Sequence, residues 1–216
     1  MSTDVVTLYA GSGSPFVWKV WLALEHKGVP YTLKMLSFSA GDTRSPEFRA
    51  INPRGKVPAI EHEGLTLWES TAILEYLEDR FPTPPLWPAD LQARARARRL
   101  VSENDAYLYP IVRRIVAETL FKPADQTDLE ALTAARTELK VELLRLAEAL
   151  EGDYLAGALS GADFSLFPSL AFIDRIEARA PQHGLAADLP PALRAYLDRM
   201  IALPVVQKTW PPHWRA

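Results

Sequence analysis

The chain has 216 residues, with 24 Lys and Arg residues against 27 Asp and Glu residues and a formal net charge of −3 at pH 7. This balance argues against a nucleic-acid partner, and no apolar run approaches the roughly 18 residues that a membrane-spanning helix needs. The chain contains no cysteine, so it can form no disulfide or thiolate metal site, and any thiol chemistry must use the sulfur of a ligand.

The first 81 residues alternate between strand and helix patterns. Short apolar runs predict strands, and apolar residues repeated at helical spacing predict helices. We expect strands over residues 5–9, 31–36, 57–61 and 65–68, and helices over residues 15–27, 46–51 and 70–81. The resulting order, β-α-β-α-β-β-α, predicts an α/β domain.

This domain contains two polar helix starts, with the bond Val57-Pro58 between them. Ser14 is a good N-cap in front of a proline, and Ser70 follows Glu69 at the later start. Each helix start offers unpaired backbone N–H groups and the positive end of a dipole, so each can hold an anion. Two such ends facing one cleft suit a small peptide that carries a thiolate and a carboxylate, which is the geometry of a glutathione site.

The rest of the chain carries only helical patterns. Residues 82–89 are rich in proline and predict a stiff linker. Beyond it we expect one helix over residues 90–118 with a kink at Pro110, and further helices over residues 125–150, from Ser160 onward and over 191–203. Ser160 and Asp163 stand at capping-box spacing. The sequence therefore predicts two domains, residues 1–81 and an all-helical domain over residues 90–216.

Two further expectations concern location and metals. The first residues lack the basic-then-apolar pattern of a signal peptide, so we expect a cytoplasmic protein. The four histidines are scattered along the chain without the spacing of metal ligands, so we expect no metal site.

Several motifs in this order resemble those of the cytosolic glutathione transferase family, over nearly the whole chain. The turn Ser14-Pro15-Phe16 resembles the family's active-site turn, and residues 52–60, NPRGKVPAI, its loop with a cis-proline. Residues 67–77, LWESTAILEYL, match its γ-glutamyl-binding corner, and Ser160–Asp163 matches the capping box of its helical domain. The resemblance implies a thioredoxin-like N-terminal domain, an all-α C-terminal domain, a homodimer and a role in detoxification.

The reaction that this resemblance implies is attack of the glutathione sulfur on an electrophilic carbon. Ser14 is the first candidate for the hydroxyl that stabilises the thiolate, because a capping oxygen accepts a hydrogen bond while its proton stays available to the sulfur. Ser12 is the second candidate, since serine-type members differ in the turn position that they use. Tyr9 is the third candidate, because it lies near the position at which tyrosine-type members carry their catalytic hydroxyl. A tyrosine that ends a buried strand is, however, usually a core residue.

The matching motifs also assign the glutathione-binding residues. Glu69 and Ser70 are expected to hold the α-amino and α-carboxylate groups of the γ-glutamyl end. Val57, before the cis bond to Pro58, is expected to pair its backbone with the cysteinyl unit. Lys56 is the candidate for the glycyl carboxylate, and Arg54 the less favoured one.

The electrophile pocket is expected between the turn and the helical domain, with Tyr107, Tyr109 and Arg113 as candidate lining residues. The same thiolate would serve an isomerase, a dehalogenase, an ether-cleaving enzyme or a peroxidase. The competing class is a non-catalytic relative that binds or regulates. The matching set of Ser14, Val57-Pro58 and Glu69-Ser70 argues against that class, because a purely structural member need not retain all of it.

Overall fold

The computed structural model describes residues 5–214, which divide into two compact units. The first comprises residues 5–87 and 204–214, and the second comprises residues 88–203. The division after residue 87 falls inside the expected linker, residues 82–89. Residues 204–214 group with the first unit, whereas the sequence predicted them in the helical domain over residues 90–216. The physical reason is that α9 (Pro204–Thr209) packs on α1 (Pro15–Lys27), where Lys208 pairs with Glu25 at 2.7 Å.

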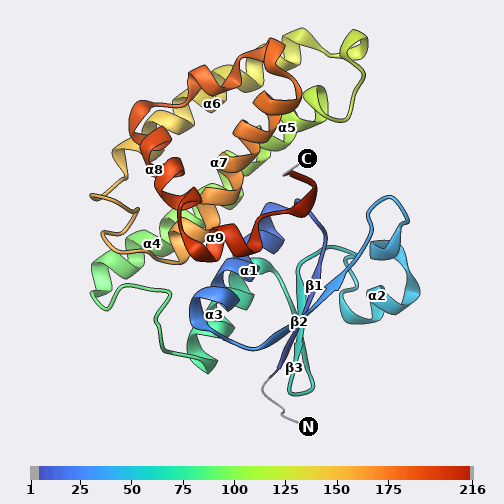
Figure 1. The fold of residues 1–216 in the computed structure, drawn as a ribbon, viewed down its shortest axis with the longest axis vertical. Helices are drawn as coiled ribbons and strands as arrows, with labels where there is room; N and C mark the ends of the chain where they lie inside the picture. The colour runs from blue at the N-terminus through green and yellow to red at the C-terminus, as the bar shows by residue number, and fades with distance from the viewer. Residues whose placement is uncertain (1–4, 215–216) are drawn as a thin grey trace. The chain divides into compact units, whose positions relative to one another are not determined.

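The first unit is built around a four-stranded mixed sheet in the order β2-β1-β3-β4. β1 runs parallel to β2 and antiparallel to β3, which is antiparallel to β4. α1 and α3 lie on one side of this sheet and α2 on the other (Figure 1). The strands are β1 (Val6–Ala10), β2 (Tyr31–Met35), β3 (Ala59–His62) and β4 (Leu65–Trp68), and the remaining helices are α2 (Pro46–Ile51) and α3 (Ser70–Arg80).

The expected element order is confirmed, and the local signals explain where α1 begins and ends. Ser14 caps its N-terminus, Pro15 occupies the first turn, and Gly28 closes the C-terminus in the left-handed conformation with φ of 65°. Val20 and Leu24 of this helix are fully buried, and the helix packs on α3. The cap therefore fixes both the start of the helix and the direction in which the preceding turn leaves β1.

The proline-rich stretch is tied to the first unit by a buried lysine. The ammonium of Lys27 donates to Glu78 at 2.7 Å, to the carbonyl of Pro84 at 2.9 Å and to the carbonyl of Phe81. Glu78 also accepts from the N–H of Leu86 at 2.8 Å. A buried ammonium is costly unless it is paired, so this network holds the stretch against the ends of α1 and α3.

The second unit is helical throughout, as expected. Its helices are α4 (Leu91–Glu103), α5 (Tyr109–Thr119), α6 (Leu129–Glu148), α7 (Gly161–Arg179) and α8 (Pro191–Ile201). The single helix expected over residues 90–118 is interrupted by a π-helical segment, Asn104–Leu108, just before Pro110. Proline has no N–H and its ring crowds the carbonyl four residues earlier, so the backbone widens there.

No helix among residues 5–214 combines the length and the apolar character that crossing a membrane requires.

The helix α7 is the core of this unit, and a capping box fixes its start. The carboxylate of Asp163 accepts from Leu155 N–H at 3.0 Å and from the N–H and hydroxyl of Ser160 at 2.8 and 3.0 Å. Asp163 is fully buried, and burial raises its pKa to about 6 although the three donors oppose that shift. The expected capping box between Ser160 and Asp163 is therefore present.

Replacing Asp163 by alanine removes the acceptor for three buried donors. We expect Asp163→Ala to lower the free energy of unfolding by about 3 kcal/mol, measured by urea unfolding followed by far-UV circular dichroism. Asp125→Ala, at an exposed residue in the turn Ala124–Gln126, is the control and should change it by less than about 0.5 kcal/mol. Equal effects of the two substitutions would contradict a structural role for the capping box.

Candidate functional site

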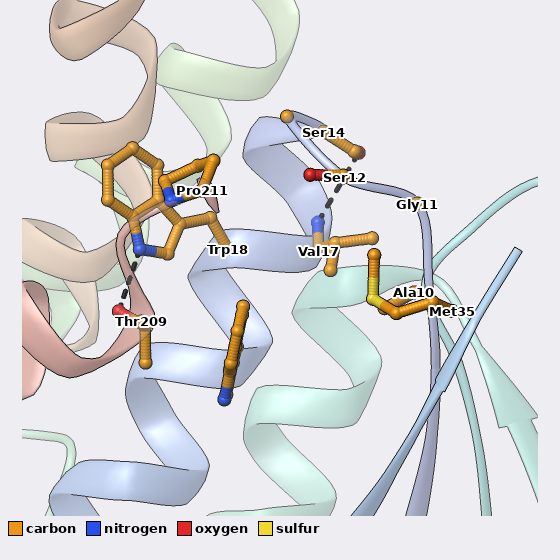
Figure 2. Close-up of a pocket in the computed structure, with 11 residues that line it drawn as sticks. Ala10, Gly11, Ser12, Ser14, Val17, Trp18, Met35, Thr209 and Pro211 are labelled. Carbon is orange, nitrogen blue, oxygen red and sulfur yellow. Dashed lines mark hydrogen bonds between the residues drawn. The ribbon is translucent and has the colours of Figure 1, made fainter. Parts of the chain in front are cut away.

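A surface pocket lies at the turn between β1 and α1. Side chains of α1, β2 and the C-terminal segment surround it (Figure 2). All of its lining residues belong to the first unit. They are Ala10, Gly11, Ser12, Gly13, Ser14, Val17, Trp18, Trp21, Met35, Thr209 and Pro211.

Both candidate serines line this pocket. The Ser14 hydroxyl accepts a long hydrogen bond, 3.4 Å, from Val17 N–H, which is the capping contact of α1 drawn in Figure 2. A hydroxyl that accepts in this way still has its own proton to donate. Ser14 therefore combines two properties that favour an anion: a hydroxyl donor and a place at the positive end of a 13-residue helix.

Ser12 has a different partner. Its hydroxyl lies 2.8 Å from Nδ1 of His213, a residue 201 positions later in the chain. Tyr9, the third candidate, does not line the pocket. Its hydroxyl donates to Glu61 and accepts from Lys34 at 3.0 Å, and its ring packs on Phe48 within a buried cluster. Tyr9 is 6 % exposed, and this burial is the main cause that raises its pKa. The cluster and the two hydrogen bonds favour a core role for Tyr9, and the two serines stay the candidates.

The C-terminal segment covers one side of the turn. The indole N–H of Trp18 donates to the Thr209 hydroxyl at 2.8 Å, and the rings of Trp210 and Trp214 meet Trp18 edge to face at centroid distances of 5.3 and 5.5 Å. A Cβ atom added to Gly13 would lie 3.1 Å from the ring of His213. The segment is thus packed onto the residues that form the pocket.

The start of α3 shows an unusual backbone. Glu69 adopts φ of 71° and ψ of 108°, which a residue with a Cβ atom rarely adopts, and its side chain does not cap the helix. Such conformations cost on the order of 1–3 kcal/mol and cluster at ligand-binding positions. Ser70 is the first residue of the helix and is 6 % exposed, and its hydroxyl has no hydrogen-bond partner within residues 5–214. The first turn of α3 therefore presents uncapped N–H groups beside a hydroxyl.

The loop before β3 contains the cis peptide bond between Val57 and Pro58, as expected. In the described chain, neither the N–H nor the C=O of Val57 has a backbone partner. Buried Asn52 shapes this loop, because its side chain donates to the carbonyl of Lys56 at 2.6 Å and accepts from Arg54 N–H at 3.0 Å. The side chain of Lys56 is exposed, and Nε of Arg54 lies 3.9 Å from Oε1 of Glu69.

The strand register brings these three segments to one edge of the sheet. Tyr9 of β1 is paired with Ala59 of β3, and Ala59 is paired with Trp68 of β4. β1 and β4 therefore end at the edge where β3 begins, since both run antiparallel to it. The turn after β1, the cis bond before β3 and the start of α3 lie together for this reason, so a helix start stands at each side of an open backbone segment.

Comparison with known proteins shows to which family this chain belongs. Residues 13–80 match the family model "Glutathione S-transferase, N-terminal domain", and residues 105–204 match "Glutathione S-transferase, C-terminal domain". Glutathione S-transferase A of Pleuronectes platessa is 32 % identical over 99 % of this chain and 94 % of its own length. The chain belongs to the glutathione S-transferase family. The expected family, the thioredoxin-like fold with its helical second half and the expectation of an enzyme are thereby confirmed.

Two further relatives are informative. Maleylacetoacetate isomerase of Rattus norvegicus is 28 % identical over 100 % of both chains. The crystal structure of a glutathione transferase from Pseudomonas putida, with one glutathione disulfide bound per subunit, superposes with a TM-score of 0.85. It is 26 % identical and covers 95 % of this chain and 90 % of that one.

The candidates for the electrophile pocket of this glutathione transferase family member lie in the second unit. Tyr107, in the π-helical segment, is 61 % exposed, and Arg113 on α5 is also exposed. Tyr109 is half-buried, and burial raises its pKa. Their place in the pocket stays a prediction. Within residues 5–214 no group of three or more His, Asp or Glu side chains could hold a metal ion.

Two features of the site were missed by the sequence analysis. The contact of His213 with Ser12 joins residues 201 positions apart, and no periodic pattern links such positions. Asn52 carried a weak signal, because the side chain of an asparagine in a turn often bonds to the backbone two residues further on. The Trp and Pro residues within 210–214 were the only indication in the sequence that the C-terminal segment packs against the rest of the protein.

Gly13 offers a direct test of the packing between the turn and the C-terminal segment. Gly13 and Gly28 both have positive φ, 81° and 65°, but a Cβ atom at Gly28 would meet nothing within 4 Å. Gly28→Ala should therefore lower the free energy of unfolding by only the conformational cost, about 1 kcal/mol. Gly13→Ala should lower it by about 1 kcal/mol more, because the new methyl group crowds His213. Equal losses in denaturant unfolding would show that the C-terminal segment does not press on the turn.

Proposed function

We propose that this protein is a glutathione transferase that activates the glutathione thiol with the hydroxyl of Ser14 and the N-terminus of α1. The observation that carries the proposal is the register Tyr9–Ala59–Trp68, which gathers the serine turn, Val57-Pro58 and Glu69-Ser70 at one edge. Glutathione has a thiol in its middle and a carboxylate at each end. A site with an anion-binding helix start on each side of an open backbone segment matches that distribution.

The thiolate is the reactive form of glutathione. A thiol has a pKa of about 8.5, so only a few per cent is ionised at neutral pH. Lowering that pKa by about two requires roughly 2.7 kcal/mol of selective stabilisation of the thiolate. A hydrogen bond to a charged group contributes about 1.5–3 kcal/mol, and a helix dipole adds about 0.3–1 kcal/mol. Ser14 and the start of α1 together account for the required amount.

The two ends of glutathione are held by the other two segments. The γ-glutamyl carboxylate accepts from the backbone N–H and hydroxyl of Ser70, and Glu69 pairs with the α-amino group. The unusual backbone of Glu69 supports this role, because such conformations cluster at ligand-binding positions and the Glu69 side chain makes no capping hydrogen bond. The backbone of Val57 pairs with the cysteinyl unit as an added strand would, and Lys56 meets the glycyl carboxylate.

In the reaction, the thiol gives its proton to solvent and the sulfur attacks an electrophilic carbon. A carbon–sulfur bond forms while the bond to the leaving group breaks, and the leaving group departs with its electron pair. The chain's own groups hold the thiolate and orient it, and no sulfur of the protein takes part. Tyr107, Tyr109 and Arg113 are proposed to line the electrophile side. Arg114 is a weaker candidate, since it pairs with Glu138.

A glutathione-dependent isomerase is the second candidate, because the match to maleylacetoacetate isomerase spans both chains completely. The same thiolate would add to a double bond, allow rotation about the resulting single bond and leave again, so that glutathione is not consumed. Assay of the protein with a cis-unsaturated diketo acid and with a chloroaromatic electrophile separates the two reactions, because only conjugation depletes glutathione. The homodimer and the cytoplasmic location stay predictions.

The role of Ser14 is tested by Ser14→Ala, with Ser45→Ala as a matched control. Ser45 caps α2 in the same way, in front of Pro46 and at 3.1 Å from Phe48 N–H, so its loss reproduces the capping cost alone. Ser14→Ala should lower kcat by roughly 10- to 1,000-fold with a small change in the affinity for glutathione. Ser45→Ala should leave kcat unchanged. A wild-type kcat in Ser14→Ala would remove Ser14 from the catalytic role.

The role of Ser70 is tested by a separate kinetic signature. Ser70→Ala removes a hydrogen bond to the carboxylate of glutathione, so KM for glutathione should rise by about tenfold while kcat stays within about twofold. Thr66→Ala, which removes an exposed hydroxyl on β4, should leave both constants unchanged. If Ser70→Ala kept the wild-type KM, the assignment of the γ-glutamyl carboxylate to α3 would be wrong.

A further inference from the structure

The hydrogen bond between Ser12 and His213 is not used by the mechanism above. The Ser12 hydroxyl lines the pocket beside Ser14, and Nδ1 of His213 lies 2.8 Å from it. Trp214, the next residue, packs edge to face on Trp18 of α1, and Thr209 accepts from the same tryptophan. The C-terminal segment is therefore anchored on α1 at two points, and these anchors place the imidazole of His213 at the turn.

We propose that His213 is a positioning residue that acts on the glutathione sulfur through Ser12. In this arrangement Nδ1–H of His213 donates to the Ser12 oxygen, which leaves the Ser12 proton free to donate to the sulfur. Ser14 supplies one hydrogen bond to the thiolate and Ser12 supplies a second. A hydroxyl that accepts one hydrogen bond becomes a stronger donor in the next, so the pair stabilises the thiolate more than Ser12 alone would. This inference rests on the proposed function, since it needs the sulfur at the turn.

The opposite direction of the same hydrogen bond would have the opposite effect. If Nδ1 accepted the Ser12 proton, the hydroxyl would present only lone pairs to the pocket, and a thiolate would be disfavoured there. The two directions therefore predict opposite changes when the imidazole is removed. This contrast makes the direction of the hydrogen bond measurable without hydrogen positions.

The experiment compares His213→Phe, His213→Asn, Ser12→Ala and the double variant Ser12→Ala/His213→Phe. Phenylalanine keeps the ring without a donor, and the side-chain amide of asparagine places an N–H donor close to the position of Nδ1. Two quantities are measured at pH 7 with saturating glutathione: the fraction of bound glutathione present as thiolate, from its ultraviolet absorbance, and kcat. His183→Phe, in the turn Pro181–His183 of the second unit, is the matched histidine control.

We expect His213→Phe and Ser12→Ala each to lower kcat by about tenfold and to reduce the thiolate fraction, because each removes the second donor. The double variant should be no worse than Ser12→Ala alone, since residues that act through one contact are not additive. His213→Asn should recover kcat to within about threefold of the wild type, and His183→Phe should behave as the wild type.

Three results would overturn the inference: an unchanged thiolate fraction in His213→Phe, an increased one, or the same loss from His213→Phe in the Ser12→Ala background as in the wild type. The last result would mean that His213 acts by packing. Calorimetry of glutathione binding to the wild type separates these outcomes from failure of the proposed function. If the wild type binds glutathione and Ser14→Ala lowers kcat and the thiolate fraction while His213→Phe changes neither, only the role of His213 is wrong.

Discussion

The site depends on the antiparallel register of β3 with its two neighbours. Pairing of Ala59 with Tyr9 and with Trp68 brings together the end of β1, the end of β4 and the segment that leads into β3. Two helices, α1 and α3, begin at this edge, so the N–H groups of both first turns lie near it. A shift of one residue in that register would turn every side chain of β3 to the opposite face and separate the three segments. The proposed chemistry therefore requires this strand pairing as well as the individual residues of the site.

A second constraint is the capping of α1. Ser14 both starts this helix and lines the pocket, and its hydroxyl can serve both purposes because capping uses its lone pair and not its proton. The C-terminal segment adds packing to the same turn, with Trp18 held between Thr209, Trp210 and Trp214. The turn is therefore fixed by the helix that follows it and by residues from the other end of the chain, which favours a preorganised site.

Much of this could be predicted from the sequence, because the signals that determine it are local. Ser14-Pro15 with Gly28 gives the limits of α1, and Ser160 with Asp163 gives the start of α7, since capping depends on side chains within a few residues of the helix end. The widened π-helical segment before Pro110 was not predicted, because a proline in a helix can be relieved by a kink or by a bulge, and packing decides which occurs. The placement of residues 204–214 and the contact of His213 with Ser12 depend on tertiary packing, for which the sequence has no periodic signal.

The turn at the start of α1 is proposed to stabilise the thiolate of bound glutathione, since the chain contains no cysteine. Titration of the ultraviolet absorbance of glutathione bound to the wild-type protein tests this claim most directly, with free glutathione as the reference. The account predicts a midpoint about two pH units below that of the free thiol. Superimposable titration curves for bound and free glutathione would contradict it.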